Sequence, residues 1–189
     1  RAHDLLRQAY RLIPRAQTSR RAALLRLIAE NRLNGGRADQ AARLYQLADQ
    51  VEPPTPAELA QHQPRLLLRL GRLSEAAAML RQELRHNQSD GSQRPAEAHR
   101  EATVLLAYIC ALQGDHGGAA QYAQQALTAA RQRGSGLLEA IAEMRMGHAC
   151  QLGPTADPLA ANQHYLQAIA LADSFNVQRT KAEAYLGLA

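Results

Sequence analysis

The chain has 189 residues; 46% of them are hydrophobic, but only seven are aromatic, six Tyr and one Phe. A core must therefore be built mainly from Ala and Leu, which are strong helix formers. No stretch alternates β-branched or aromatic residues with polar ones, so no strand is predicted. The composition favours an all-α protein.

The formal net charge of +5 is unevenly distributed. Residues 1–81 carry 14 Arg against 7 acidic residues, a net +7, and residues 82–189 carry 8 basic against 10 acidic residues, a net −2. The longest basic run is Arg20-Arg21, without interleaved aromatic residues for base stacking, so we expect no direct nucleic-acid contact. Neither an 18-residue apolar run nor a charged and apolar leader occurs, which predicts no membrane contact and a cytoplasmic location.

Apolar periodicity and turn residues predict helices along the whole chain. The expected elements are a leading helix near 2–13, the pairs 18–34 with 37–51, 56–70 with 73–86, 96–113 with 117–132 and 137–152 with 158–174, and a last helix from about 178. Partners are separated by "NGGR" (34–37), "LGR" (70–72), "QGDHGG" (113–118) and "LGPTADP" (152–158), where glycine suits a left-handed helix C-cap. Thr55-Pro56 and Asp157-Pro158 predict N-caps, and "NQSDGSQRP" (87–95) and "RGSG" (133–136) are expected to be longer linkers between pairs.

The sequence repeats with a period of forty residues. Small residues recur in the first helices at Ala107, Gly147 and Gly187, each with an alanine five residues earlier, at Ala102, Ala142 and Ala182. The second helices carry triplets at spacings of four and then three: Ala41–Tyr45–Ala48, Ala119–Ala123–Ala126 and Ala161–Tyr165–Ala168. This spacing places each triplet on one helix face, which predicts hairpins that stack on their neighbours.

The glycine-rich "QGDHGG" does not fit a nucleotide-binding loop. Such a loop needs a preceding strand and a Lys followed by Ser or Thr, whereas "ATVLLAYICALQ" is helical and no Lys follows Gly117 or Gly118. Asp115 and His116 could act as orienter and base, but the sequence places no nucleophile beside them. We interpret the stretch as a capping turn and expect no catalytic residues.

Metal and cofactor sites are not predicted either. None of the seven histidines lies three or four residues from another, and neither cysteine lies two to four residues from the other. Cys110 and Cys150 are forty residues apart, at equivalent repeat positions, so both are expected to be reduced and buried.

These features resemble the tetratricopeptide (TPR) superfamily, in its long variant of about forty residues. The matching positions are the small first-helix residue (Ala107, Gly147, Gly187), the alanine that opens the second helix (Ala41, Ala76, Ala119, Ala161) and the second small residue there (Ala48, Ala126, Ala168). "ALQGDHGGAAQYAQQALTAARQRG" and "ANQHYLQAIALADSFNVQRTKAEAYLGLA" look like repeats in the MalT-like sensory arms of LuxR-family and SARP-type bacterial transcriptional regulators. The resemblance covers residues 18–189; Pro64 and Glu83 depart from it, which predicts an irregular second hairpin.

The resemblance implies one TPR-like domain over 1–189, an α-solenoid of four antiparallel helix pairs with a leading and a truncated last helix, and a piece of a longer protein. It also implies a groove that is lined by the first helices. Two positions of each first helix would face the groove: the residue directly after the small first-helix residue, and the residue three positions before that small residue. These positions are Arg26, Glu30, Val104, Tyr108, Met144 and His148. Tyr108 and His148 either face such a groove or fill the packing between repeats.

The sequence is compatible with two functions. The chain is either the arm of a regulator that binds a protein, peptide or small effector, or a structural scaffold that self-associates through its unequally charged halves.

Overall fold

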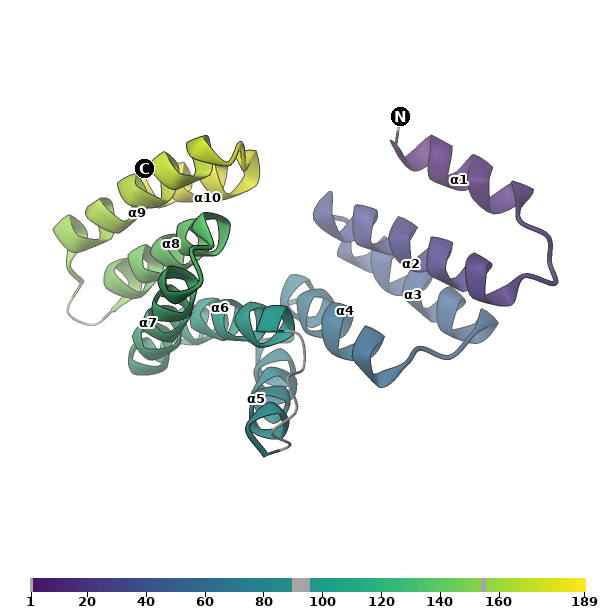
Figure 1. Ribbon diagram of the computed structural model, residues 1–189, viewed down its shortest axis with the longest axis horizontal. Coiled ribbons are helices and arrows are strands. Elements are labelled where there is room, and N and C mark those ends of the chain that lie inside the picture. Colours follow the sequence, from purple (N-terminus) through teal and green to yellow (C-terminus); the bar gives the residue numbers. More distant parts are fainter. Residues whose placement is uncertain (1, 90–95, 154–155) are drawn as a thin grey trace. The chain divides into compact units, whose positions relative to one another are not determined.

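The computed structural model describes residues 2–89, 96–153 and 156–189 (Figure 1), with side chains described for 5–6, 8–85, 101–153 and 156–189. Within these residues the chain forms ten helices and no strand. The helices are α1 (Ala2–Leu12), α2 (Thr18–Asn34), α3 (Ala38–Val51), α4 (Pro56–Arg69), α5 (Leu73–Ser89), α6 (Ala96–Leu112), α7 (His116–Gln132), α8 (Gly136–Leu152), α9 (Pro158–Ser174) and α10 (Gln178–Leu188). The predicted all-α helical-repeat array is confirmed.

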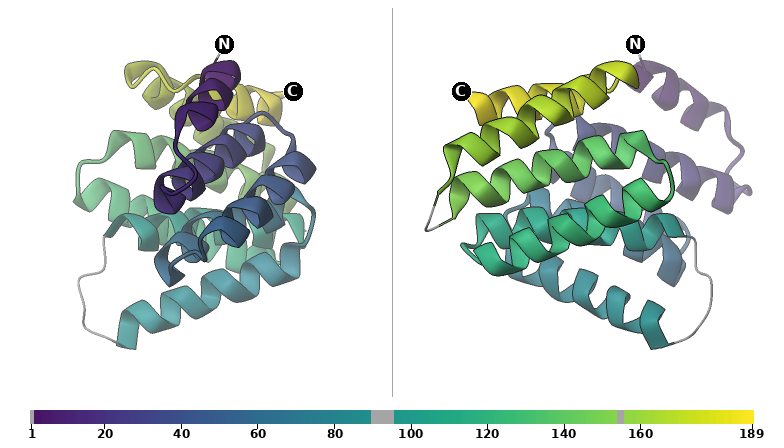
Figure 2. Two further views of the ribbon diagram at one scale, coloured as in Figure 1. Left: turned by 90° about the vertical axis from the view of Figure 1, so that its right-hand side faces the viewer. Right: turned by 60° about the vertical axis from the view of Figure 1, so that its left-hand side comes forward.

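The chain divides into two compact units, unit 1 from Arg1 to Ala76 and unit 2 from Ala77 to Ala189. In unit 1, α2 packs against α1, α3 and α4. In unit 2, α6 to α9 each pack against the next helix in the chain, as Figure 2 shows for α7, α8 and α9. The first helices of unit 2 also pack against one another, α6 on α8 and α8 on α10. That the two units form a single repeat domain stays a prediction.

Three predicted glycine turns adopt the expected left-handed C-cap. Gly36, Gly71 and Gly114 have φ angles of 74°, 75° and 77°. In each turn the N–H that follows the glycine donates to the carbonyl five residues earlier, and in the first turn Arg37 N donates to Arg32 O at 2.9 Å. These bonds satisfy carbonyls that the end of the helix leaves open.

Two connections differ from expectation. "RGSG" is not a longer linker but the same tight turn, since Gly134 has a φ of 63° and Ser135 N donates to Ala130 O. Gly153 is extended, with φ −71° and ψ 156°, so the left-handed cap expected there is wrong. Between α9 and α10 the left-handed residue is Asn176, at φ 54°. Residues 87–89 of the expected linker 87–95 belong to α5, so the linker was predicted to begin too early. Residues 90–95 and 154–155 lie outside the described part of the chain.

Side-chain caps begin three of the helices whose first residues and caps the structure describes. At α4, Glu58 N donates to Thr55 Oγ1 while Thr55 N donates to Glu58 Oε2, which is the reciprocal capping box. Asp115 accepts from Gly118 N at 2.9 Å and Asp157 accepts from Ala160 N at 3.0 Å. The stretch "QGDHGG" is therefore a turn followed by a capped helix.

The small residues of the repeat lie where helices meet. All members of the three second-helix triplets are buried, as are Ala102, Ala107, Ala142 and Gly147 in the first helices. Ala182 is exposed, against expectation, and α10 buries Thr180 and Ala184 instead. Pro64 is buried and α4 continues through it, so this hairpin keeps its helical first member.

Among the described residues, none of the helices has the length and apolar character needed to cross a bilayer.

Candidate functional site

Tyr108 and His148, predicted to face one groove, lie together in unit 2. Their ring centroids are 5.4 Å apart and the ring planes are tilted by 36°. Tyr108 comes from α6 and His148 from α8, two first helices that pack side by side. The expectation that equivalent repeat positions become spatial neighbours is thus confirmed for this couple.

Arg145 joins these two side chains to the next first helix. Its guanidinium carbon lies 4.1 Å from the Tyr108 ring centroid, and Nη1 lies 3.2 Å from His148 Nδ1. Because arginine can only donate, His148 Nδ1 is the acceptor of this bond. Nη2 pairs with Glu183 Oε2 of α10 at 3.5 Å. Tyr108, Arg145, His148 and Glu183 form the Arg145 cluster, which spans α6, α8 and α10.

The Arg145 cluster is only partly accessible. The Arg145 side chain is 10% exposed, and its buried Nε has no hydrogen-bond partner among the described residues. Burial lowers the pKa of this guanidinium, and Glu183 acts in the opposite direction. Burial, together with the positive charge of Arg145, also lowers the pKa of His148 to about 4. His148 is therefore neutral at pH 7, which suits its role as an acceptor.

Tyr165 of α9 connects the cluster to the core of unit 2. Its ring meets His148 edge to face at 5.6 Å. Its hydroxyl donates to Gln151 Oε1 at 2.7 Å, and Gln151 Nε2 in turn donates to the Gly187 carbonyl at 3.0 Å. Burial raises the pKa of Tyr165 to about 12, so the hydroxyl remains a donor at neutral pH.

Val104 and Met144 do not line a groove, and the expectation of exposure is wrong for both. They are 7% and 1% exposed and pack in hydrophobic clusters with residues of α7 and α9, respectively. The position three residues before the small one faces inward, between a first helix and its partner. An apolar residue there is a core residue.

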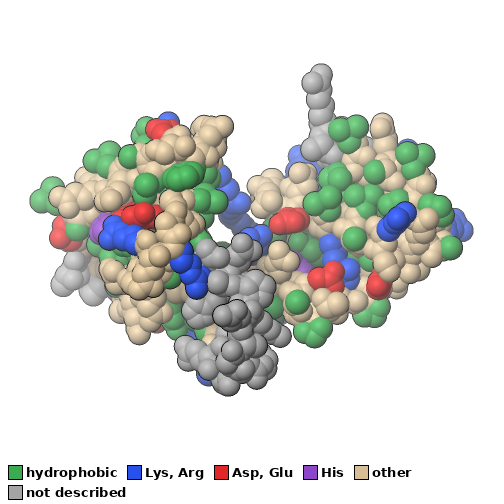
Figure 3. Space-filling view, in the orientation of Figure 1, with side chains coloured by type: hydrophobic (Ala, Val, Ile, Leu, Met, Phe, Trp, Pro, Cys, Tyr) green, Lys and Arg blue, Asp and Glu red, His purple; other side chains and the backbone are tan. Residues whose placement is uncertain are grey.

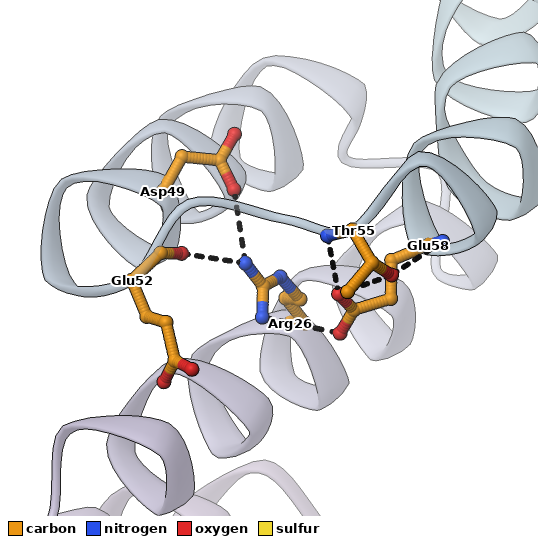
Figure 4. A network of polar contacts seen from close by, with 5 residues as sticks. All are labelled: Arg26, Asp49, Glu52, Thr55 and Glu58. Carbon is orange, nitrogen blue, oxygen red and sulfur yellow. Dashed lines mark hydrogen bonds and ion pairs between the residues drawn. The ribbon is translucent and has the colours of Figure 1, made fainter.

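Arg26 occupies the equivalent position in unit 1 and is compensated by polar partners (Figure 4). The side chain is 13% exposed. Nη1 pairs with Glu58 at 3.2 Å, while Nη2 donates to the Glu52 carbonyl at 2.7 Å and lies 3.4 Å from Asp49 Oδ1. These contacts join α2 to the end of α3 and to the capping box of α4.

Glu30 lies near Arg26 at the edge of a small cavity between α2 and α4. Glu30 Oε1 pairs with Arg65 Nη1 at 3.3 Å, and the two side chains are 45% and 36% exposed. The Tyr45 and His62 rings stack at 4.2 Å with an interplanar angle of 11°. All four side chains, with Arg26 and Glu58, line a cavity of about 230 Å³. We call this space the unit 1 cavity.

The repeat rule selects the residue after the small one and the residue three before it. Applied to the second repeat, this rule selects two further residues that line the unit 1 cavity. Arg65 follows Pro64 directly and Gln61 lies three residues before it, so these two positions match those of Glu30 and Arg26. Both side chains line the unit 1 cavity. His62 and Glu58 have no such positional signal and were missed.

Apolar side chains gather over α1 and α2 on the face drawn in Figure 3. Leu5, Leu12 and Leu27 are exposed in these helices. A hollow of about 480 Å³, lined by Leu5, Leu6, Ala9 and Leu27, lies between α1 and α2 and is bordered by Glu30.

A buried carboxylate in α8 was also missed by the sequence rules. Glu143 is 1% exposed, accepts from Arg131 Nη2 at 2.7 Å and pairs with His164 Nδ1 at 2.6 Å. Arg131 also donates to Glu139 at 2.8 Å. The network ties α7, α8 and α9 together, and its buried charge is fully paired.

The described side chains include no group of three or more His, Cys, Asp or Glu arranged to hold a metal ion. Cys110 and Cys150 are both free; Cys110 is buried as expected, whereas Cys150 is only partly buried. Burial raises the pKa of both thiols, which makes them poor nucleophiles at neutral pH.

No protein-family model matches the chain. No curated protein matches it by sequence.

Proposed function

We propose that this chain is a non-catalytic binding module and serves as the sensing or interaction arm of a larger, cytoplasmic bacterial transcriptional regulator. The regulator assignment rests on the resemblance to MalT-like repeats. The binding role is supported by one observation, the Arg145 cluster, in which Tyr108, Arg145, His148 and Glu183 converge from three successive first helices.

The composition of this cluster suits recognition. Tyrosine and arginine are the side chains that most often dominate the energetics of binding interfaces, because they combine a large contact area with directional donors. Tyr108 is partly exposed, and its ring is already held against the Arg145 guanidinium. A partner that covers this face would gain contact area at little cost in side-chain entropy.

The binding role can be tested with the purified chain. Peptides selected from a random display library on the wild-type chain should lose binding to the double variant Tyr108→Ala/His148→Ala, with circular dichroism unchanged. A matched control is Tyr122→Ala/His116→Ala on the second helix α7, which should bind the same peptides as wild type. Equal binding by wild type and the Tyr108/His148 variant would contradict the assignment of this face.

The regulator assignment needs a separate test. Peptide mapping of the native protein by mass spectrometry identifies the residues that flank this sequence. A P-loop ATPase module or a DNA-binding helix-turn-helix in the flanks would support the proposal. Flanks that hold only further repeats would contradict it and favour the alternative function, a scaffold.

The scaffold alternative rests on the unequal charge, +7 in residues 1–81 and −2 in residues 82–189. Copies that pair through opposite charges would dissociate as salt screens the attraction. Light scattering at low and high ionic strength tests this, and a strict monomer at low ionic strength rules out charge-driven self-association.

A further inference from the structure

We propose that the unit 1 cavity binds a small aliphatic amino acid in its zwitterionic form. This site lies in unit 1 and uses none of the residues of the Arg145 cluster, so it adds a second, independent ligand site to the chain.

The size of the cavity restricts the ligand. Its volume of about 230 Å³ is below the roughly 300–1,000 Å³ of pockets that hold drug-sized ligands. Ala23, Leu27 and Leu33 contribute an apolar part of the lining. Arg26, Glu30, Glu58 and Arg65 contribute charged groups, so the cavity offers both apolar and ionic contacts to a molecule of a few heavy atoms.

The charges of the lining balance. Arg26 and Arg65 carry two positive charges, and Glu30 and Glu58 carry two negative charges. His62 is neutral at pH 7, because burial lowers its pKa. An isolated anion or cation would meet like charges in such a lining, whereas a molecule with both a carboxylate and an ammonium can pair each group with its opposite.

Tyr45 supplies a hydroxyl donor at this site. The residue is 5% exposed and lines the cavity. Burial, reinforced by the charge of Glu30, raises the pKa of Tyr45 to about 12, so the hydroxyl keeps its proton. A hydroxyl in the lining can donate to a ligand that supplies an acceptor.

The ligand would bind by replacing the ion pair between Glu30 and Arg65. Both side chains are more than a third exposed, and an ion pair of this kind contributes only about 0–1 kcal/mol. The ligand ammonium would replace Arg65 at Glu30, and the ligand carboxylate would pair with Arg65 and accept from the Tyr45 hydroxyl. The aliphatic side chain would lie against Leu27 and Ala23.

Isothermal titration calorimetry of the chain with L-leucine tests the proposal. We expect L-leucine to bind at least about tenfold more tightly than isovalerate, which lacks the ammonium, and 3-methylbutylamine, which lacks the carboxylate. Glycine, which lacks the side chain, should also bind more weakly. No binding of L-leucine, L-valine or L-alanine would overturn the proposal, as would equal affinity for leucine and its two singly charged analogues.

Variants then locate the site. Tyr45→Phe removes one hydroxyl without altering the stacked ring and should weaken L-leucine binding at an unchanged melting temperature; binding at wild-type affinity would overturn the assignment of this cavity. Glu30→Gln should abolish the preference for leucine over isovalerate, and a retained preference would contradict the ammonium contact. Tyr108→Ala/His148→Ala should bind leucine as wild type does, which separates this site from the proposed partner-binding face.

Discussion

Gly147 of α8 lies directly against the ring of Tyr165 of α9. A Cβ atom on Gly147 would be 2.6 Å from Tyr165 Cε1, which is closer than any side chain can approach. Gly187 of α10 meets the same ring. Two first helices of unit 2 therefore each carry a glycine at the point where they contact this one tyrosine. The small residue of the forty-residue repeat is therefore a steric requirement in both helices.

Replacing Gly147 with Val should destabilise the protein by about 1–3 kcal/mol, because the branched side chain overpacks the contact with Tyr165. Thermal melting followed by circular dichroism measures the loss. Gly117→Val is the matched control, since a Cβ there meets nothing within 4 Å. Equal melting temperatures for the two variants would contradict the close approach.

Stability should fall as the pH drops from 6.5 towards 4, in part because of His148. Its folded pKa of about 4 is below the value of 6.5 for an unperturbed histidine, so the unfolded state takes up a proton first. The stability contribution is therefore complete above pH 6.5 and is lost as the pH falls through this range. His148→Gln should flatten the dependence of melting temperature on pH, and an unchanged slope would show that His148 is not shielded from protonation.

Glu143→Gln should cost about 1–3 kcal/mol, because an amide replaces a carboxylate that is bonded to both Arg131 and His164. Glu139→Gln removes a charge beside the same arginine from a side chain that is 21% exposed, and should cost less than about 1 kcal/mol. Chemical denaturation of both variants tests the difference. A larger loss for Glu139→Gln would mean that Glu143 does not hold the network.

Thr55→Ala should destabilise the start of α4 by about 1 kcal/mol, since Glu58 N loses its acceptor. The Thr55 N–H, the Thr55 hydroxyl and Arg26 also lower the pKa of Glu58. An NMR titration should therefore show a higher Glu58 pKa in the variant, while Thr55→Ser should retain both stability and pKa. Identical titration curves for Ala and wild type would rule out the contact between the Thr55 hydroxyl and Glu58.

The helices could be predicted closely because their ends carry local chemistry. Gly36, Gly71 and Gly114 mark left-handed caps, and Thr55 and Asp157 mark N-caps, so each end is specified by one or two residues. Gly153 shows the limit of this reasoning, since glycine permits a left-handed cap without requiring it.

The candidate sites were predictable only in part. A periodic rule finds positions that recur. It predicted correctly that Tyr108 and His148 are neighbours, and Glu30, which it also selected, lines the unit 1 cavity. It cannot tell whether a position faces solvent or the next helix, which is why Val104 and Met144 were misassigned. Arg145 and Glu183 come from other repeat positions, and only the packing of three helices brings them together.

The recurrent turn has a consequence for how such an array can grow. The same hydrogen bond closes turns within two hairpins, at Arg37 and Asp115, and two turns between hairpins, at Ser135 and Val177. At these turns the backbone does not distinguish the inside of a hairpin from the junction between two. A duplicated segment could begin at either kind of turn and still join its neighbours with the geometry already in place.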